Sequence, residues 1–292
     1  MEVTQDNRFD IAPDTKLWRY MSFAKFAALL HQKELVFVPA YMFEDPYEGA
    51  GGIARNLEKF TKALVDYFWD KVSEEMGSLH VTKEQMPEYL KAYIQSASDL
   101  GRANRYYTFV NCWHENEAES EAMWKLYTAS QPDGVAIQTT YGALKKAINA
   151  SDVQIGRVTY GNFETVFFPG DSYFWYKRKS FEHEREVRAM IEPSDEKRKE
   201  LEEIYKKNTF TLTHPVDLDI LIHNVYISPY ASDWVQDVVE EELKLCGLNK
   251  PVLSSKMNDE ALFFPSRKQL REILNQMQED RKTRLAEENM EE

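Results

Sequence analysis

The segment from residue 180 to residue 192 constrains the fold more than any other part of the chain. It reads Ser-Phe-Glu-His-Glu-Arg-Glu-Val-Arg-Ala-Met-Ile-Glu and passes from a charged stretch into an alternating strand. Side chains on a strand alternate between its two faces, so Val187 and Ile191 are expected on one face. Glu186 and Arg188 are expected on the other.

Glu184 and Glu186 are the first candidate site residues. They are two positions apart, so on an extended backbone their carboxylates point to the same side. Arg185 and Arg188 are close enough in sequence to neutralise them. The pattern fits a catalytic pair and a structural ion-pair cluster equally, because perturbed carboxylates occur in both settings.

The remaining patterns predict an α+β fold with a mixed or antiparallel sheet. A strand at 17–21, a helix capped by Ser22 and a strand at 35–39 form a tight unit. Further strands or apolar runs are expected at 106–113, 134–140, 153–160, 218–228 and 251–253. We expect one domain over residues 1–265 with a helical insertion at about 56–98. A charged C-terminal helix and tail at 266–292 is a candidate for oligomerisation.

Composition excludes several classes of protein. The 292 residues are 43% hydrophobic and 13% aromatic, which indicates a compact globular chain rather than a disordered one. The formal net charge of −13 disfavours non-specific binding of nucleic acid, which depends on Lys and Arg. A local basic stretch at 176–179, directly before the two glutamates, either holds an anionic group or neutralises them.

Cysteine usage and the N-terminus point to the cytoplasm. Cys112 and Cys246 are far apart and have no metal-ligand neighbours in sequence, so no disulfide framework or zinc module is expected. The first residues lack the basic and apolar regions of a signal peptide. No apolar run approaches the length of a membrane span. We therefore expect a cytoplasmic protein that does not bind membranes.

Two further segments have more than one interpretation. The acidic, turn-rich loop at 43–49 is either a solvated loop or a loop that covers a ligand. The helix at 119–127 carries Trp124 and Tyr127 at i and i+3, most simply as core-facing aromatics. Stacking on a ligand ring is the alternative for both side chains.

An ordered set of motifs resembles the uncharacterised bacterial DUF2971 family. The set covers residues from about 17 to 257. The chain departs from the family at Glu44, where asparagine is usual, and at Trp113, where phenylalanine is usual. The family name implies no activity. The motifs are Leu17-Trp18-Arg19-Tyr20, Phe43-Glu44-Asp45-Pro46-Tyr47-Glu48, Cys112-Trp113, Met123-Trp124-Lys125-Leu126-Tyr127, Gly134-Val135-Ala136-Ile137 and residues 181–188.

The layout is also similar, more loosely, to ADP-ribosyltransferases, which have an arginine on a first strand and a Glu-x-Glu on a third. This resemblance implies that Arg19 holds the phosphates of NAD, Glu184 orients the acceptor, and Glu186 stabilises the ribose as it becomes oxocarbenium-like. Tyr20, Asn111, Trp124 and Tyr127 complete the expected NAD site. In the middle strand this chain has Asn111-Cys112-Trp113, whereas the ADP-ribosyltransferase pattern has Ser-Thr-Ser.

The chemistry of such a site is sound on physical grounds. Cleavage of the nicotinamide bond develops positive charge on the sugar, so a fixed carboxylate favours the transition state over the ground state. A guanidinium can contact a pyrophosphate in a bidentate manner. The expected ligand is therefore a small nucleotide, while the macromolecular acceptor is left open.

Three functions are compatible with the sequence. The first is an NAD-consuming transferase in phage defence or acting as a toxin effector. The second is a nuclease-like enzyme that holds Mg²⁺, although its usual acid-acid-x-lysine spacing is missing. The third is a non-catalytic sensor or partner-binding protein. The metal ligands in the nuclease hypothesis are Glu44, Asp45, Glu48, Glu184 and Glu186.

Overall fold

The structure is a computed structural model that describes residues 7–49, 65, 69, 82–128, 132–163, 173–205, 210–258 and 270–279. Its contacts divide the chain into two compact units, Met1–Ser255 and Lys256–Glu292. The second unit contains the short 3-10 helix η4 (Lys256–Asn258) and a helix at 270–279. Among the described residues, no helix has the length and apolarity needed to cross a membrane.

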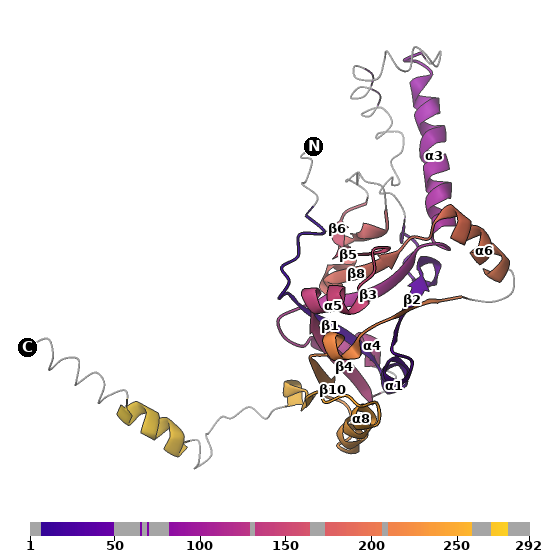
Figure 1. Ribbon diagram of the computed structural model, residues 1–292. Coiled ribbons are helices and arrows are strands. Elements are labelled where there is room, and N and C mark those ends of the chain that lie inside the picture. The colour runs from indigo at the N-terminus through magenta and orange to yellow at the C-terminus, as the bar shows by residue number, and fades with distance from the viewer. Residues whose placement is uncertain are drawn as a thin grey trace, which may run out of the picture. The chain divides into compact units, whose positions relative to one another are not determined.

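The first unit is an α+β fold on a nine-stranded, mostly antiparallel sheet (Figure 1). The strand order is β11-β10-β4-β1-β3-β2-β9, and β8 pairs with β3 and β5. Among the described strands of this sheet, only β10 and β11 pair in parallel, while β6 (Thr159–Gly161) and β7 (Tyr176–Arg178) form a separate parallel pair. The nine strands are β1 (Lys16–Ser22), β2 (Glu34–Pro39), β3 (Phe109–Glu115), β4 (Gly134–Thr140), β5 (Val153–Arg157), β8 (Glu186–Ile191), β9 (Leu212–Pro215), β10 (Asn224–Ile227) and β11 (Val252–Ser254).

Several of the described helices begin at a residue whose side chain caps them. Ser22 accepts a hydrogen bond from a backbone N–H group of α1, as predicted, and Thr140 does the same for α5. Asp233 precedes α8 without a side-chain cap bond. The helices are α1 (Phe23–Gln32), α3 (Met86–Asn104), α4 (Glu121–Thr128), α5 (Tyr141–Ile148), α6 (Asp195–Tyr205), α7 (Leu218–Leu221) and α8 (Trp234–Leu245), with 3-10 turns η1 (Ala40–Met42), η2 (Tyr173–Trp175) and η3 (Lys179–Glu184).

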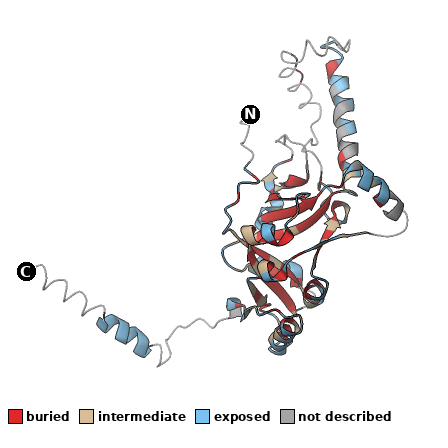
Figure 2. Ribbon diagram, in the orientation of Figure 1, coloured by how far each residue is buried: buried red, intermediate tan, exposed pale blue. Residues whose placement is uncertain are grey.

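The main hydrophobic core lies between one face of the sheet and helices α1, α5, α7 and α8. Leu17 of β1 and Val187 of β8 contribute to it together with Leu30, Leu144 and Val239 from the helices. All five side chains are 0% exposed, and burial of this apolar surface stabilises the fold by about 1.5–3 kcal/mol per side chain. Figure 2 shows the strands as largely buried, in contrast to α3 and α6.

The opposite face of the sheet carries two smaller clusters. Trp18 and Tyr20 pack with Trp124 of α4, and Met190 packs with Trp175 and neighbouring aromatic residues. Val187 and Met190 therefore lie in different clusters, which confirms the predicted alternation of β8. Both faces of this strand are covered, so every residue from Glu186 to Ile191 is buried.

Several predicted boundaries differ from the structure. The run at 218–228 divides into α7 and β10, because the side chain of Asp217 caps a helical turn at its start. The strand expected at 153–160 divides into β5 and β6. Of the insertion expected at 56–98, the described part is α3 with Pro87 in its first turn, together with two isolated positions, and the rest lies outside the described residues.

The sheet splits beside the middle of β3. Strand β1 pairs with β3 only at Leu17 and Trp18, whose partners are Glu115 and His114. Strand β2 pairs with the other end of the same edge, at Val110. Within the described residues, positions 111–113 of β3 therefore have strand partners only on the β8 side. The gap between β1 and β2 is where the candidate site lies.

Candidate functional site

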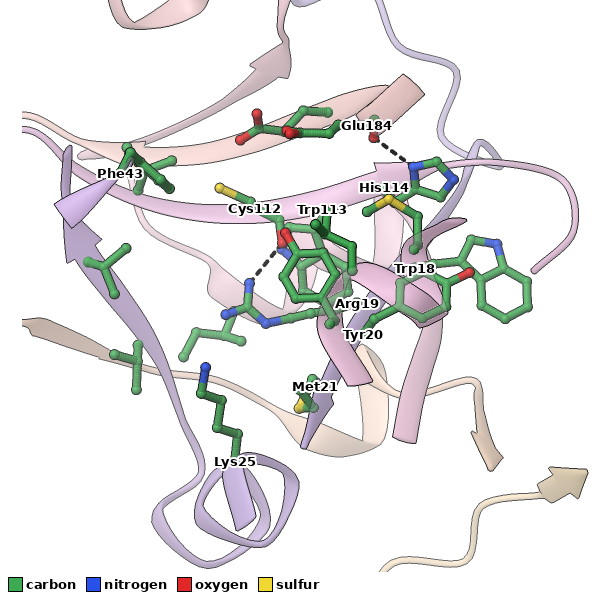
Figure 3. A pocket seen from close by; sticks show the side chains of 18 of the residues that line it. Trp18, Arg19, Tyr20, Met21, Lys25, Phe43, Cys112, Trp113, His114 and Glu184 are labelled. Atoms are coloured by element: carbon green, nitrogen blue, oxygen red, sulfur yellow. Dashed lines mark hydrogen bonds between the residues drawn. The ribbon is translucent and has the colours of Figure 1, made fainter. Parts of the chain in front are cut away.

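A cavity of about 680 Å³ opens at this split in the sheet. Its size lies within the range of small-molecule sites, about 300–1,000 Å³. Residues of β1, α1, β2, β3, α4 and the 43–48 loop line it, as do side chains at 177–186 (Figure 3). Arg19, Glu184 and Glu186, which come from three separate parts of the sequence, are among the lining residues.

Arg19 bridges the gap between β1 and β3. Its Nη1 donates to the Oδ1 atom of Asn111 and to the carbonyl oxygen of Cys112, both at 2.8 Å. Its guanidinium lies 5.8 Å from the ring centroid of Trp113. In the described part of the chain these neutral groups are the hydrogen-bond partners of Arg19 and no carboxylate forms an ion pair with it. Burial lowers the pKa of its guanidinium. A cation that is held only by neutral groups in a cavity is suited to bind an anionic ligand.

Glu184 does not lie on the extended backbone that the sequence predicts. It ends the 3-10 turn η3, and Arg185 follows in the left-handed conformation at φ 40°, so β8 begins only at Glu186. The two carboxylates nevertheless converge, because Lys177 Nζ lies 2.5 Å from Glu184 Oε2 and 3.3 Å from Glu186 Oε2. Contact with Lys177 therefore brings the two carboxylates together, and not the alternation of an extended strand that the sequence predicted.

Glu186 belongs to a buried ion-pair network with Arg188 and Glu48. Arg188 Nε donates to Glu186 Oε1 at 2.7 Å, and its Nη2 donates to Glu186 Oε2 at 3.1 Å. Arg188 Nη1 donates to Glu48 Oε1 at 2.5 Å and also to the carbonyl oxygen of Phe174. The side chains of Arg188 and Glu48 are 0% exposed and that of Glu186 is 4% exposed. Both oxygens of Glu186 are thus fixed in place.

The environments of the two glutamates move their pKa values in opposite directions. Burial opposes ionisation of Glu186, but Arg188 and Lys177 outweigh it and lower its pKa to about 2. Burial raises the pKa of Glu184, and Lys177 offsets only part of this effect. Two neighbouring carboxyl groups with separated pKa values are a pattern typical of acid–base sites.

Two groups in the cavity, Cys112 and His114, were not predicted as site residues, and a third, Tyr127, was predicted both as a core-facing aromatic and as a member of the NAD site. Burial and the charge of Glu186 raise the pKa of Cys112 well above its ordinary value, which keeps its thiol protonated. Tyr127 is 46% exposed and lines the cavity, so the expectation that it faces the core is wrong. His114 donates from Nδ1 to the carbonyl oxygen of Glu184 at 2.6 Å, and its Nε2 has no partner among the described residues.

The other expected NAD-site residues divide between cavity and core. Tyr20 lines the cavity, but its hydroxyl accepts a hydrogen bond from Ser120 N–H at 2.9 Å. Trp124 is 0% exposed and donates from Nε1 to Glu119, so it packs in the core and cannot stack on a ligand. Asn111 is 1% exposed. Its Oδ1 accepts from Arg19, and its Nδ2 donates to the carbonyl oxygen of Val36. Neither Asn111 nor Trp124 lines the cavity.

The loop at 43–49 forms one wall of the cavity and is tied to the sheet. Arg178 Nη2 lies 2.8 Å from Asp45 Oδ1, and Glu48 pairs with Arg188 as described. Gly49 ends the loop at φ +70°, with no room for a Cβ beside Phe174. The sequence did not indicate these pairs, because Glu48 and Arg188 are 140 positions apart.

The five carboxylates of the nuclease hypothesis all line this cavity. Four of them are paired with cations: Asp45 with Arg178, Glu48 with Arg188, and the two others with Lys177. In the described residues, the one group of side chains with the convergence of a metal site lies elsewhere, at His31, Glu242 and Cys246. Ion pairing with basic side chains therefore balances the charge of these four carboxylates.

Comparison of the chain with models of protein families, with curated proteins and with solved structures found no match in any of the three.

Proposed function

We propose that this chain is an ADP-ribosyltransferase-like enzyme that uses NAD as its substrate. The convergence of Arg19, Glu184 and Glu186 on one cavity is the single observation that carries the proposal. We propose in addition that the chain is related to DUF2971 proteins and that its fold is ADP-ribosyltransferase-like. Its proposed role is in the cytoplasm, either in phage defence or as a toxin effector. The acceptor of the ADP-ribose is not part of the proposal.

The cavity residues supply two different kinds of binding group. Arg19 offers a guanidinium with no carboxylate partner among the described residues, which suits the diphosphate of the dinucleotide. Lys25, an exposed lysine of α1, lines the cavity as well and adds positive charge. Tyr127, which is 46% exposed, offers an aromatic surface to a base or to nicotinamide.

The carboxylate end of the cavity has the properties that transfer requires. When the bond from ribose C1′ to nicotinamide breaks, its electron pair leaves with nicotinamide and positive charge grows on the ribose. Glu186 is ionised and rigid, so it contributes a preorganised negative charge without reorganisation during the reaction. Glu184, whose pKa is raised, accepts the proton that the attacking acceptor group releases.

The test is NAD binding by calorimetry in the presence of a metal chelator. Wild type is expected to bind, and Arg19→Gln is expected to lose most of the affinity. Arg102→Gln is a matched control, because Arg102 is an exposed arginine of α3 that pairs with Asp99 outside the cavity. Binding that disappears with the chelator would favour the nuclease hypothesis. Equal affinity in wild type and Arg19→Gln would refute the assignment of Arg19.

A further inference from the structure

A second cluster of chemically active side chains lies where α1 and α8 pack against each other. His31 is in the last turn of α1, Glu242 is in the last turn of α8, and Cys246 follows directly as its C-cap. His31 Nε2 lies 3.0 Å from Glu242 Oε2, and Cys246 Sγ lies 3.9 Å from His31 Nδ1. None of these residues lines the cavity.

The geometry of the cluster fits a transition-metal ion. One nitrogen of His31, one carboxylate oxygen of Glu242 and Cys246 Sγ all lie within 4.8 Å of one another. Ligands about 2.0–2.3 Å from a tetrahedral zinc ion are separated by roughly 3.2–3.8 Å. Glu242 faces Nε2 of His31 and Cys246 faces Nδ1, so binding of one ion requires the ring to turn until a single nitrogen meets the ion. The side chains of His31 and Glu242 are 59% and 25% exposed, which leaves them free to rotate.

The surrounding charges favour a cation at this position. The C-terminal ends of α1 and α8 meet here, and each carries the negative end of a helix dipole. Glu242 and Cys246 are at i and i+4, so they project from the same face of α8. Thiolate, imidazole and carboxylate together match the preferences of Zn²⁺ and Co²⁺, whereas Mg²⁺ and Ca²⁺ prefer oxygen ligands alone.

We propose that His31, Glu242 and Cys246 form a site for a single Zn²⁺ ion that links α1 to α8. On binding, the thiol of Cys246 releases its proton to solvent and the thiolate bonds to the ion, with no change of oxidation state. Water completes the fourth coordination position. Because α1 also supplies Lys25 and Leu29 to the cavity, the ion fixes one wall of the candidate active site. The site itself is independent of the proposed transferase activity.

Titration of the full chain with Co²⁺ tests the site, because a cobalt–thiolate bond gives a charge-transfer absorption in the near ultraviolet. We expect this band to saturate at one ion per chain and to disappear when Zn²⁺ is added in competition. Cys246→Ser is expected to abolish the band, and His31→Gln and Glu242→Gln are expected to weaken binding at least tenfold. Cys112→Ser and His223→Gln are matched controls that are expected to retain it.

A thermal measurement gives a second readout that does not depend on spectroscopy. Zn²⁺ is expected to raise the unfolding midpoint of wild type and of Cys112→Ser, because it binds the folded chain in preference to the unfolded one. It is expected to leave Cys246→Ser unchanged. Absence of the cobalt band from wild type, or a band that persists in Cys246→Ser and is lost in Cys112→Ser, would overturn the proposal.

Discussion

Arg19 donates to the backbone carbonyl of Cys112 at 2.8 Å, at the point where β1 and β2 separate along β3. A side chain thereby bonds a backbone carbonyl at a position whose described strand partner lies only on the β8 side. The same guanidinium lines the cavity that the separation opens. Arg19 therefore bridges the two sides of the split sheet and also forms part of the cavity wall.

Arg19→Lys is expected to weaken NAD binding by about 10–100-fold while retaining the positive charge. Lysine lacks the planar fork that contacts Asn111, Cys112 and a diphosphate together. Loss of one charged hydrogen bond of about 1.5–3 kcal/mol accounts for this range. Calorimetry with NAD and with ADP-ribose checks the result, and unchanged affinity for both ligands would show that the charge alone suffices.

Arg188→Met is expected to destabilise the fold by about 3–5 kcal/mol. The change leaves Glu48 without its cation in a buried site and removes the strongest partner of Glu186. Urea unfolding measures the difference in free energy, with Arg102→Met as an exposed control. If the two variants lose similar stability, the buried network does not hold the 43–49 loop as described.

Lowering the pH is expected to reduce the free energy of unfolding, because the carboxylate of Glu186 becomes protonated. Its pKa falls from an ordinary value of 4.5 to about 2 on folding, so its contribution is complete above pH 4.5 and is lost as the pH falls toward 2. The difference corresponds to about 3 kcal/mol. Unfolding free energies between pH 6 and pH 2 are expected to fall less steeply in Glu186→Gln than in wild type. Equal slopes would show that Glu186 is not held as an ion.

Gly49→Ala is expected to lower stability by about 1–3 kcal/mol and to reduce NAD turnover. Alanine is strained at φ +70°, and its Cβ would meet the ring of Phe174. Movement of the loop would also displace Glu48 from Arg188. Gly247→Ala is a useful comparison, since Gly247 has φ +73° with nothing near its Cβ position and therefore reports backbone strain alone. Equal losses in the two variants would rule out a steric role for Phe174.

Local sequence signals predicted much of the fold. Ser22 before α1 and the apolar spacing of α1 gave the β1–α1–β2 unit, because capping and helical periodicity act over a few residues. The apolar run at 134–140 likewise predicted β4. Local signals did not predict the backbone at Glu184. The left-handed conformation of Arg185 places the start of β8 at Glu186, two residues later than the alternation of side chains suggests.

The site was only partly predictable because its partners are distant in sequence. The pairing of Glu186 with Arg188 follows from strand alternation, whereas the pairing of Arg188 with Glu48 and of His31 with Cys246 depends on packing of the whole unit. Spacing also cannot distinguish a buried aromatic from an exposed one on a short helix. Trp124 and Tyr127 of α4 show this, since one is enclosed and the other faces the cavity.

Release of nicotinamide from NAD tests the central claim most directly. Wild type, Glu184→Gln and Glu186→Gln are compared with metal chelated and with cell extract as a source of acceptor, after circular dichroism has shown that each is folded. We predict release by wild type and a loss of at least about 100-fold in both variants, since each removes a group that acts in the transfer step. Absence of release by wild type, even with extract present, would contradict the proposed function and leave the two glutamates as members of a structural ion-pair cluster.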